Sequence, residues 1–208
     1  GIDVSGSNIH IFNNKITNFD DAIAIKPLKN TCTENVLVEN NKIVYGVGIS
    51  IGSVPSSYHH CVKNVLFRNI HANKPYKLIY IKTESSDKYN EPVSMISNIT
   101  YDNISAEYPK FWPIYIGPQQ QKEPDGTGAG FWPNTNPNVN IRNITMKNIK
   151  IHGINPSKHV GVLRCNKTNP CMNIIMNNIQ IKGSNLRYIC DNNQSIYGKY
   201  SNINPTPK

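Results

Sequence analysis

An asparagine-framed repeat constrains the fold of this 208-residue chain more than any other feature. Each copy reads Asn, Ile or Val, a variable residue, an apolar residue, a variable residue and Asn, with another apolar residue soon after. Because the apolar residues lie two apart, both fall on one face of a strand, so each copy predicts a short β-strand with corners at Asn. The six copies occupy residues 8–13, 35–40, 64–69, 98–103, 143–148 and 173–178.

A second set of short alternating segments recurs in step with the repeat, at residues 23–25, 49–51, 79–81, 114–116, 162–164 and 188–190. Successive copies begin 27, 29, 34, 45 and 30 residues apart, and no helical period lies between them. This spacing fits one coil of a parallel β-solenoid, in which coils rise by roughly 4.8 Å each. Asn tolerates the left-handed backbone of tight corners, and stacked corner amides can hydrogen-bond from coil to coil. A leucine-rich horseshoe or a β-sandwich fits less well, because Leu is scarce and hairpin turns are missing.

The solenoid is predicted to be a single all-β domain over residues 1–208. Nothing before Asn8 could cap the first coil, so we expect further coils and a cap upstream of this chain. Residues 119–133 are rich in Gln, Gly and Pro and predict a long surface loop, a flap beside the cleft.

Composition limits the partners. No apolar stretch approaches the roughly 20 residues of a membrane span, so no membrane contact is expected. Lys and Arg outnumber Asp and Glu by 22 to 13, and the net charge of +9 favours a polyanion. Nucleic acid is disfavoured because the lysines are scattered and no aromatic RNA-binding signature accompanies them. Acidic polysaccharide is therefore the expected polyanionic partner.

Five cysteines leave at least one outside any disulfide within the chain. The short segment between Cys165 and Cys171 turns back at Asn169 and Pro170, which favours a disulfide between these two cysteines. Two separate buried thiols are the alternative, and the partners of the other cysteines stay open.

Two adjacent carboxylates, Asp20 and Asp21, precede the inward-facing Ile23 and Ile25. By alternation Asp21 would point into the apolar core, which is costly for an unpaired charge. We therefore expect a bend or bulge that turns both side chains to the surface. Two carboxylates in different surroundings suit an acid and a base, although a solvated pair at a turn is the plainer alternative.

Three segments resemble signature blocks of glycoside hydrolase family 28, the polygalacturonases that cut the polygalacturonate backbone of pectin. They are Asp-Asp-Ala-Ile-Ala-Ile-Lys at 20–26, Gly-Val-Gly-Ile-Ser-Ile-Gly-Ser at 46–53 and Tyr-Ile-Lys-Thr at 80–83. A fourth block matches only through Gly-Ile-Asp at 1–3, so the family's further catalytic Asp falls immediately before Gly1. The resemblance continues through 112–119 and 161–171. It implies a right-handed parallel β-helix, a secreted enzyme acting as a monomer, and no cofactor or metal.

The resemblance also implies roles in an inverting mechanism. Asp20 would be the general acid, Asp21 part of the base, and Lys82 a point charge for a galacturonate carboxylate. The family's active-site His is Val47 here, in phase with the core residues, and the family's Arg is Tyr80, which can stack on a sugar ring. A catalytically inactive solenoid that binds acidic polysaccharide is the rival hypothesis.

Five Asn-x-Ser/Thr sequons occur. Three lie in the repeat, at Asn98, Asn103 and Asn143, where corners already explain Asn. The predicted glycosylation sites are therefore the two sequons in loops, Asn166 and Asn193.

Overall fold

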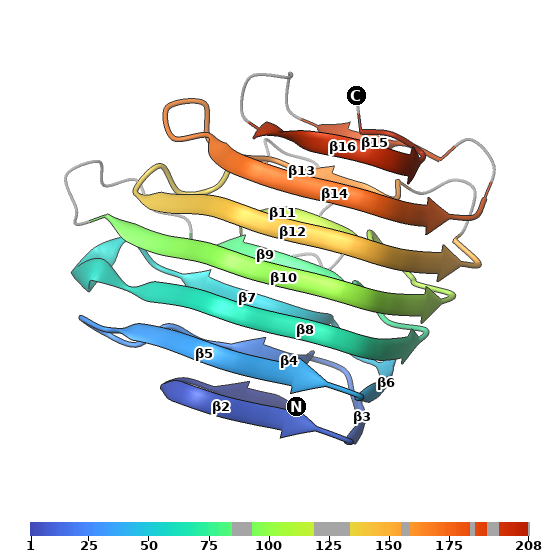
Figure 1. Cartoon of the computed structure of the whole chain (residues 1–208), viewed down its shortest axis with the longest axis horizontal. Helices are drawn as coiled ribbons and strands as arrows, with labels where there is room; N and C mark the ends of the chain where they lie inside the picture. The colour runs from blue at the N-terminus through green and yellow to red at the C-terminus, as the bar shows by residue number, and fades with distance from the viewer. Residues whose placement is uncertain (85–92, 119–133, 155–158, 184–185, 191–195, 208) are drawn as a thin grey trace.

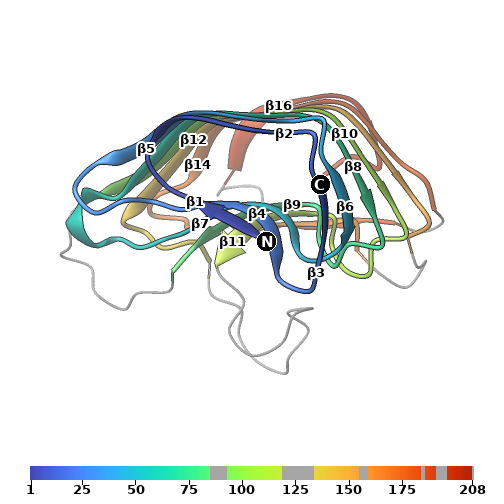
Figure 2. The ribbon, with the colours of Figure 1, turned by 90° about the horizontal axis from the view of Figure 1, so that it is seen from below.

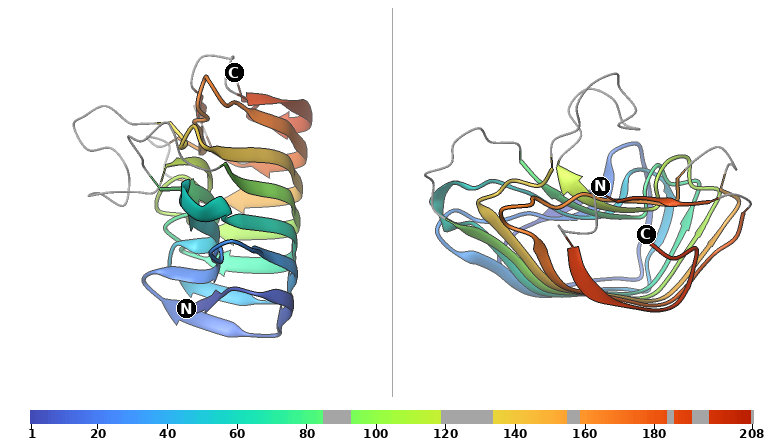
Figure 3. Two further views of the ribbon diagram at one scale, coloured as in Figure 1. Left: turned by 90° about the vertical axis from the view of Figure 1, so that its left-hand side faces the viewer. Right: turned by 90° about the horizontal axis from the view of Figure 1, so that it is seen from above.

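The computed structural model is a right-handed parallel β-helix, as predicted. It describes residues 1–84, 93–118, 134–154, 159–183, 186–190 and 196–207. Figure 1 shows the coils stacked from the N-terminus to the C-terminus, and Figure 3 shows the two termini at opposite ends of the stack. No helix of the described residues is long and apolar enough to cross a membrane. The predicted flap at 119–133 lies outside the described residues.

Two parallel sheets form the walls, and Figure 2 shows them facing each other across the interior. The seven-stranded sheet contains, in order, β1 (Ile2–Val4), β4 (Asp21–Ile25), β7 (Gly48–Val54), β9 (Ile79–Thr83), β11 (Ile114–Pro118), β13 (Gly161–Leu163) and β15 (Tyr188–Cys190). The nine-stranded sheet contains β2 (Ser7–Phe12), β5 (Cys32–Glu39), β8 (Cys61–Asn73), β10 (Ser94–Glu107), β12 (Val139–His152), β14 (Cys171–Ile181) and β16 (Ile196–Asn204), with β3 (Lys15–Asn18) and β6 (Lys42–Tyr45) beside them. A 3-10 turn, η1 (Ser57–His59), follows β7.

The repeated asparagines form the corners as predicted. Both Asn residues of all six copies have a positive φ, between 53° and 59°. Their side-chain amides stack along the helix axis: Asn98 Nδ2 donates to Asn64 Oδ1 at 3.1 Å, and Asn143 Nδ2 donates to Asn98 Oδ1 at 2.9 Å. From β8 onward each strand continues across its Asn corners without interruption. The two short strands predicted for each coil are therefore one long, bent strand.

Rows of β-branched residues fill the interior because successive coils align in register. In the seven-stranded sheet Ile23, Ile49 and Ile79 pair in sequence, and all three side chains are fully buried. The aromatic rings of Phe67 and Tyr101 stack within the same core, with centroids 4.8 Å apart. Stacked identical side chains bury one continuous apolar face, which is what holds a solenoid together.

Two disulfides are present among the described residues, one closing a short loop and one joining neighbouring coils. Cys165 and Cys171 are joined, the pairing that their spacing favoured. Cys32 and Cys61 form a second disulfide that the sequence analysis missed. The signal was present, because each lies three residues before the first Asn of its repeat copy, and their strands pair in that register. The fifth cysteine is Cys190, in β15.

Candidate active site

The candidate site lies on the outer face of the seven-stranded sheet. Strand register brings one residue from each coil into a row along this face, and the apolar residues on either side of the row point inward. Because the row crosses every coil, residues far apart in sequence meet within a few strand spacings. The row runs Asp3, Ala24, Ser50, Tyr80, Tyr115, Val162 and Ile189.

A β-bulge at the start of β4 sets the direction of Asp21. In the pairing of β4 with β7, Asp21 aligns with Gly48 and Ile23 aligns with Ile49, so β4 carries one extra residue, Ala22. Ala22 and Ile23 both belong to the core, and Asp21 is thereby left on the outer face. The predicted bend is present. The expectation that both carboxylates reach the surface is wrong for Asp21, whose side chain is only 6% exposed.

Three side chains surround the Asp21 carboxylate: Ser50 and Lys82 from the next two coils, and Lys26 from its own coil. Lys82 Nζ donates to Oδ2 at 2.7 Å, and Ser50 Oγ donates to Oδ1 at 2.7 Å. Lys26 Nζ lies 3.7 Å from Oδ2 and also 3.7 Å from an oxygen of Asp3. These partners replace the lost water shell, which is the condition for burying a carboxylate. The sequence analysis placed Lys82 at the site but gave no role to Ser50 or Lys26, although strand alternation puts both on this face.

Asp20 has a different environment one residue earlier. Its side chain is exposed, and its Oδ1 accepts a hydrogen bond from the Asp21 amide at 2.7 Å. Asn18 Nδ2 donates to the Asp21 carbonyl at 2.8 Å and so holds the same turn. A cavity of about 280 Å³ opens here, lined by Gly1, Asp3, Asp20, Asp21 and Lys26. The exposed Asp20 carboxylate and the ion-paired Asp21 carboxylate therefore face the same small volume, together with Asp3.

An apolar cluster continues the outer face toward the C-terminus: Val47, Tyr80, Trp112, Tyr115 and Val162. The Tyr80 ring is 1% exposed and meets the Tyr115 ring edge-on, with centroids 4.9 Å apart. Burial, and secondarily Tyr80, raises the pKa of the Tyr115 phenol well above its ordinary value. Lys82 Nζ lies 4.5 Å from the Tyr80 ring centroid.

Two sequence expectations change with this cluster. Val47 was expected in the core with Ile49, but it lies on the outer face because Gly46 and Gly48, with φ of 70° and 93°, interrupt the strand alternation. Tyr80 was expected to stack on a sugar, but it is only 1% exposed, and the ammonium groups of Lys77 and Lys82 each lie 4.5 Å from its ring centroid. Its contacts instead shape the wall beside Lys82.

The two predicted glycosylation sites differ in what the structure shows. Asn166 lies in the loop closed by Cys165 and Cys171, and its Oδ1 accepts hydrogen bonds from Thr168 N at 2.9 Å and Thr168 Oγ1 at 2.7 Å. Asn193 lies outside the described residues.

Comparisons with known proteins agree with the fold and identify the family. The model of the family "Glycosyl hydrolases family 28" matches residues 1–200. Rhamnogalacturonase A of Aspergillus aculeatus is 26% identical over 202 residues, which are 95% of this chain and 40% of that protein. An exopolygalacturonase of Arabidopsis thaliana is 30% identical over 183 residues, which are 87% of this chain and 38% of that protein. The chain thus spans about two fifths of the length of these curated relatives.

A solved structure extends the comparison to three dimensions. Endopolygalacturonase I from Stereum purpureum, solved in complex with two galacturonate, matches with a TM-score of 0.68 and 22% sequence identity. The match covers 96% of this chain and 54% of that chain. At this identity the likeness shows the fold alone.

Proposed function

We propose, because this chain belongs to glycosyl hydrolase family 28, that the protein hydrolyses galacturonosyl linkages in the backbone of pectin with inversion at the anomeric carbon. The observation that carries the proposal is the Asp20 and Asp21 pair, held at a bulge on the outer face and lining one cavity with Asp3. Polygalacturonate, with α-1,4 linkages, is the first candidate substrate. The +9 net charge supports an acidic polymer.

The two carboxylates would divide the chemistry by their surroundings. Asp20 is exposed, so it can give its proton to the glycosidic oxygen as the bond to the anomeric carbon breaks. Asp21 is fixed by Lys82 and Ser50, so it can orient a water molecule and accept its proton as the new carbon–oxygen bond forms on the opposite face. Each carboxylate oxygen has a second lone pair, so its present partners leave room for that water.

Lys82 would then have two tasks. Its ammonium holds Asp21, and its remaining N–H groups can donate to a substrate carboxylate, since an ammonium has three donors. Tyr80 would limit how that sugar lies rather than stack on it, because its ring is packed against Tyr115.

Rhamnogalacturonan is a second candidate substrate, favoured by a specific observation. Beyond Lys82 the outer face is mainly apolar through Val47, Tyr80 and Trp112. Its nearest lysine, Lys77, is only 1% exposed and its ammonium lies 4.5 Å from the Tyr80 ring centroid, so it is shielded from a substrate carboxylate. A backbone that alternates galacturonate with an uncharged deoxy sugar needs a cation only at every second ring. Several similar curated proteins, including that of Aspergillus aculeatus, are named rhamnogalacturonases.

The two disulfides support a secreted location for the protein, because disulfides persist in oxidising compartments. In that setting the loop sequon at Asn166 would carry a glycan.

The test is a reducing-end assay with the complete gene product on polygalacturonate and on rhamnogalacturonan. Asp20→Asn should lower turnover by roughly 10²- to 10⁴-fold while binding survives, because general acid catalysis is lost. Asp21→Asn should lower turnover similarly. Asp102→Asn is the matched control, since Asp102 is also ion-paired, with Lys147 at 3.2 Å, but lies on the other sheet.

Two outcomes would overturn the proposal. A parent protein that binds pectate and releases no reducing ends would favour the rival, a binding solenoid without catalysis. An Asp20→Asn variant as active as the parent would remove Asp20 from the role of acid. The residue encoded immediately before Gly1 is a further check, because an Asp there would add the family's remaining carboxylate to the cavity that Gly1 lines.

A further inference from the structure

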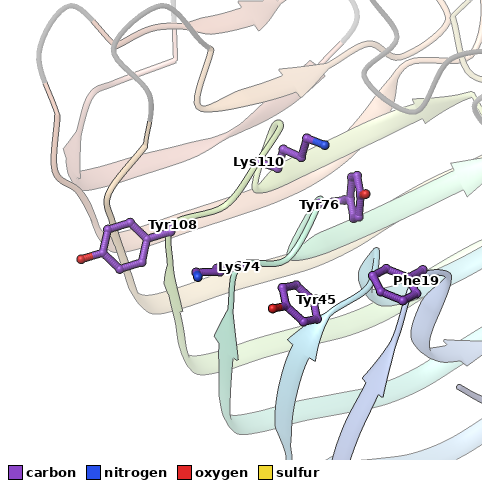
Figure 4. A pocket seen from close by; sticks show the side chains of 6 residues that line it. All are labelled: Phe19, Tyr45, Lys74, Tyr76, Tyr108 and Lys110. Carbon is purple, nitrogen blue, oxygen red and sulfur yellow. The ribbon is translucent and has the colours of Figure 1, made fainter.

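A second cleft lies at the corner where the coils turn into the seven-stranded sheet. It has a volume of about 450 Å³ and is distinct from the cavity at the carboxylate pair. Figure 4 shows its side chains rising from successive coils, with Lys74 between Tyr45 and Tyr108. Its lining consists entirely of aromatic and lysine side chains: Phe19, Tyr45, Lys74, Tyr76, Tyr108 and Lys110.

Three of the four aromatic rings that line this cleft are exposed to solvent. Phe19 is 74% exposed, Tyr108 is 59% exposed and Tyr45 is 38% exposed. The rings of Phe19 and Tyr45 stack with centroids 5.7 Å apart and form one apolar platform. Lys110 Nζ lies 4.9 Å from the Tyr76 ring centroid, which places a cation over the next platform. Exposed apolar groups gathered at one hollow mark a binding surface, whereas scattered ones do not.

The backbone at this corner gives an independent reason to look for a function. Tyr45, Lys74 and Tyr108 are the corner residues of three stacked coils, with φ of 64°, 53° and 53°. Bulky side chains are disfavoured there, and Asn occupies both corners of every repeat copy in this chain. The next coil uses Gly153, with φ of 73°, at the same position. Side chains kept against the local preference of the backbone are expected where they serve a function.

The charge of the cleft favours an anionic ligand. Two lysines line it, and among the described residues no carboxylate does. Ring faces suit the apolar faces of pyranose rings, and lysine ammonium groups suit carboxylates. The lining residues come from four successive coils, so the cleft spans about three strand spacings, or roughly 14 Å. That is room for several linked sugars along the helix axis.

We propose that this aromatic and lysine cleft is a second polysaccharide-binding site, which holds a uronate-containing segment of the polymer while the Asp20 and Asp21 pair acts on another. The inference rests on the proposed function only for the choice of ligand, since it requires binding and no bond cleavage. The cleft begins at Phe19, adjacent in sequence to Asp20, so a bound segment would reach the carboxylate pair directly.

The test uses the complete gene product carrying Asp20→Asn, so that binding is measured without turnover. The variant Tyr45→Asn/Tyr108→Asn is titrated with polygalacturonate, rhamnogalacturonan and a neutral galactan. We expect the dissociation constant for an acidic polymer to rise roughly tenfold from the loss of two ring contacts. The unfolding midpoint should stay the same or rise, because Asn suits a left-handed corner better than Tyr.

Tyr58→Asn is the matched control. Tyr58 also has a left-handed backbone, with φ of 58°, and is 52% exposed. It follows β7 whereas Tyr45 precedes it, so the two rings lie at opposite ends of that strand. The control should leave the dissociation constant unchanged.

Each contrary result removes the proposal. An unchanged dissociation constant in the double variant would show that no acidic polymer binds there. A clear drop in the unfolding midpoint would show that the rings serve packing. An equal loss of affinity for neutral galactan would contradict recognition of the uronate. A change from dimer to monomer in the double variant would identify a second copy of the chain as the occupant. The Asp20→Asn background keeps these results separate from any failure of hydrolysis.

Discussion

The ion pair between Asp21 and Lys82 offers the sharpest test of how the site is built. The two side chains are only 6% and 12% exposed, and Lys82 Nζ lies 2.7 Å from Asp21 Oδ2. Lys82→Met keeps the apolar stem and removes the ammonium, which leaves a buried carboxylate short of a partner. Losing one partner of a buried ion pair costs roughly 3–5 kcal/mol. Because Ser50 and the more distant Lys26 remain, we expect the free energy of unfolding to fall by about 3 kcal/mol.

A double-mutant cycle separates the contact from other effects of the substitutions. Asp21→Asn in the Lys82→Met background removes the stranded charge, so the double variant should be more stable than additivity predicts by roughly 2 kcal/mol. Urea unfolding followed by tryptophan fluorescence measures all four proteins. Lys42→Met is the control, since Lys42 is an exposed strand lysine and its loss should change stability by less than about 0.5 kcal/mol. A Lys82→Met loss below about 1 kcal/mol, or an additive double variant, would refute the reasoning.

Salt distinguishes the two tasks of Lys82. An open point charge for substrate would lose its effect at high ionic strength, because screening acts on exposed charges. The contact with Asp21 is largely shielded from solvent, so the loss of turnover in Lys82→Met should persist at high salt. Disappearance of that loss at high salt would show that Lys82 acts mainly on the substrate.

Three further predictions concern the rest of the chain. Asn41→Ala should lower the free energy of unfolding in urea by about 3 kcal/mol, because the buried Asn41 Oδ1 accepts hydrogen bonds from Asn14 N and Asn14 Nδ2, both at 2.9 Å. A decrease below about 1 kcal/mol would contradict this. The hydrogen bond from Arg68, with a smaller one from His10, lowers the pKa of Glu39 from its ordinary value of 4.5. The stabilisation by ionised Glu39 is present above pH 4.5 and is lost as the pH falls through the folded-state pKa. The melting temperatures of the parent and Glu39→Gln should therefore converge in acid. A difference in melting temperature that does not change with pH would show that the Glu39 charge contributes nothing. Asn166→Gln should remove one endoglycosidase-sensitive glycan from the secreted protein, and an unchanged electrophoretic band would show that the site is not used.

Most of the fold could be read from the sequence because a solenoid is periodic. Each coil contacts mainly its neighbours, so a local pattern determines the strand, the corner and the stacking together. The Asn ladder illustrates this: the residue that tolerates the left-handed corner also supplies the amide that bonds to the next coil. The disulfide between Cys32 and Cys61 follows from the same repeat, because both cysteines occupy the same position relative to the first Asn of their copies and are partners in the strand register.

The site was only partly predictable, since it depends on where the period breaks. The sequence and its family resemblance named Asp20, Asp21 and Lys82 as candidates, and alternation showed that Asp21 needed a bend. Only the tertiary structure decided which carboxylate became buried, because one extra residue in β4 turns Asp21 toward Lys82, 61 positions away. The outward position of Val47 could not be predicted either, because Gly46 and Gly48 have a positive φ that interrupts the inward-outward alternation of the strand, and residue spacing does not show this.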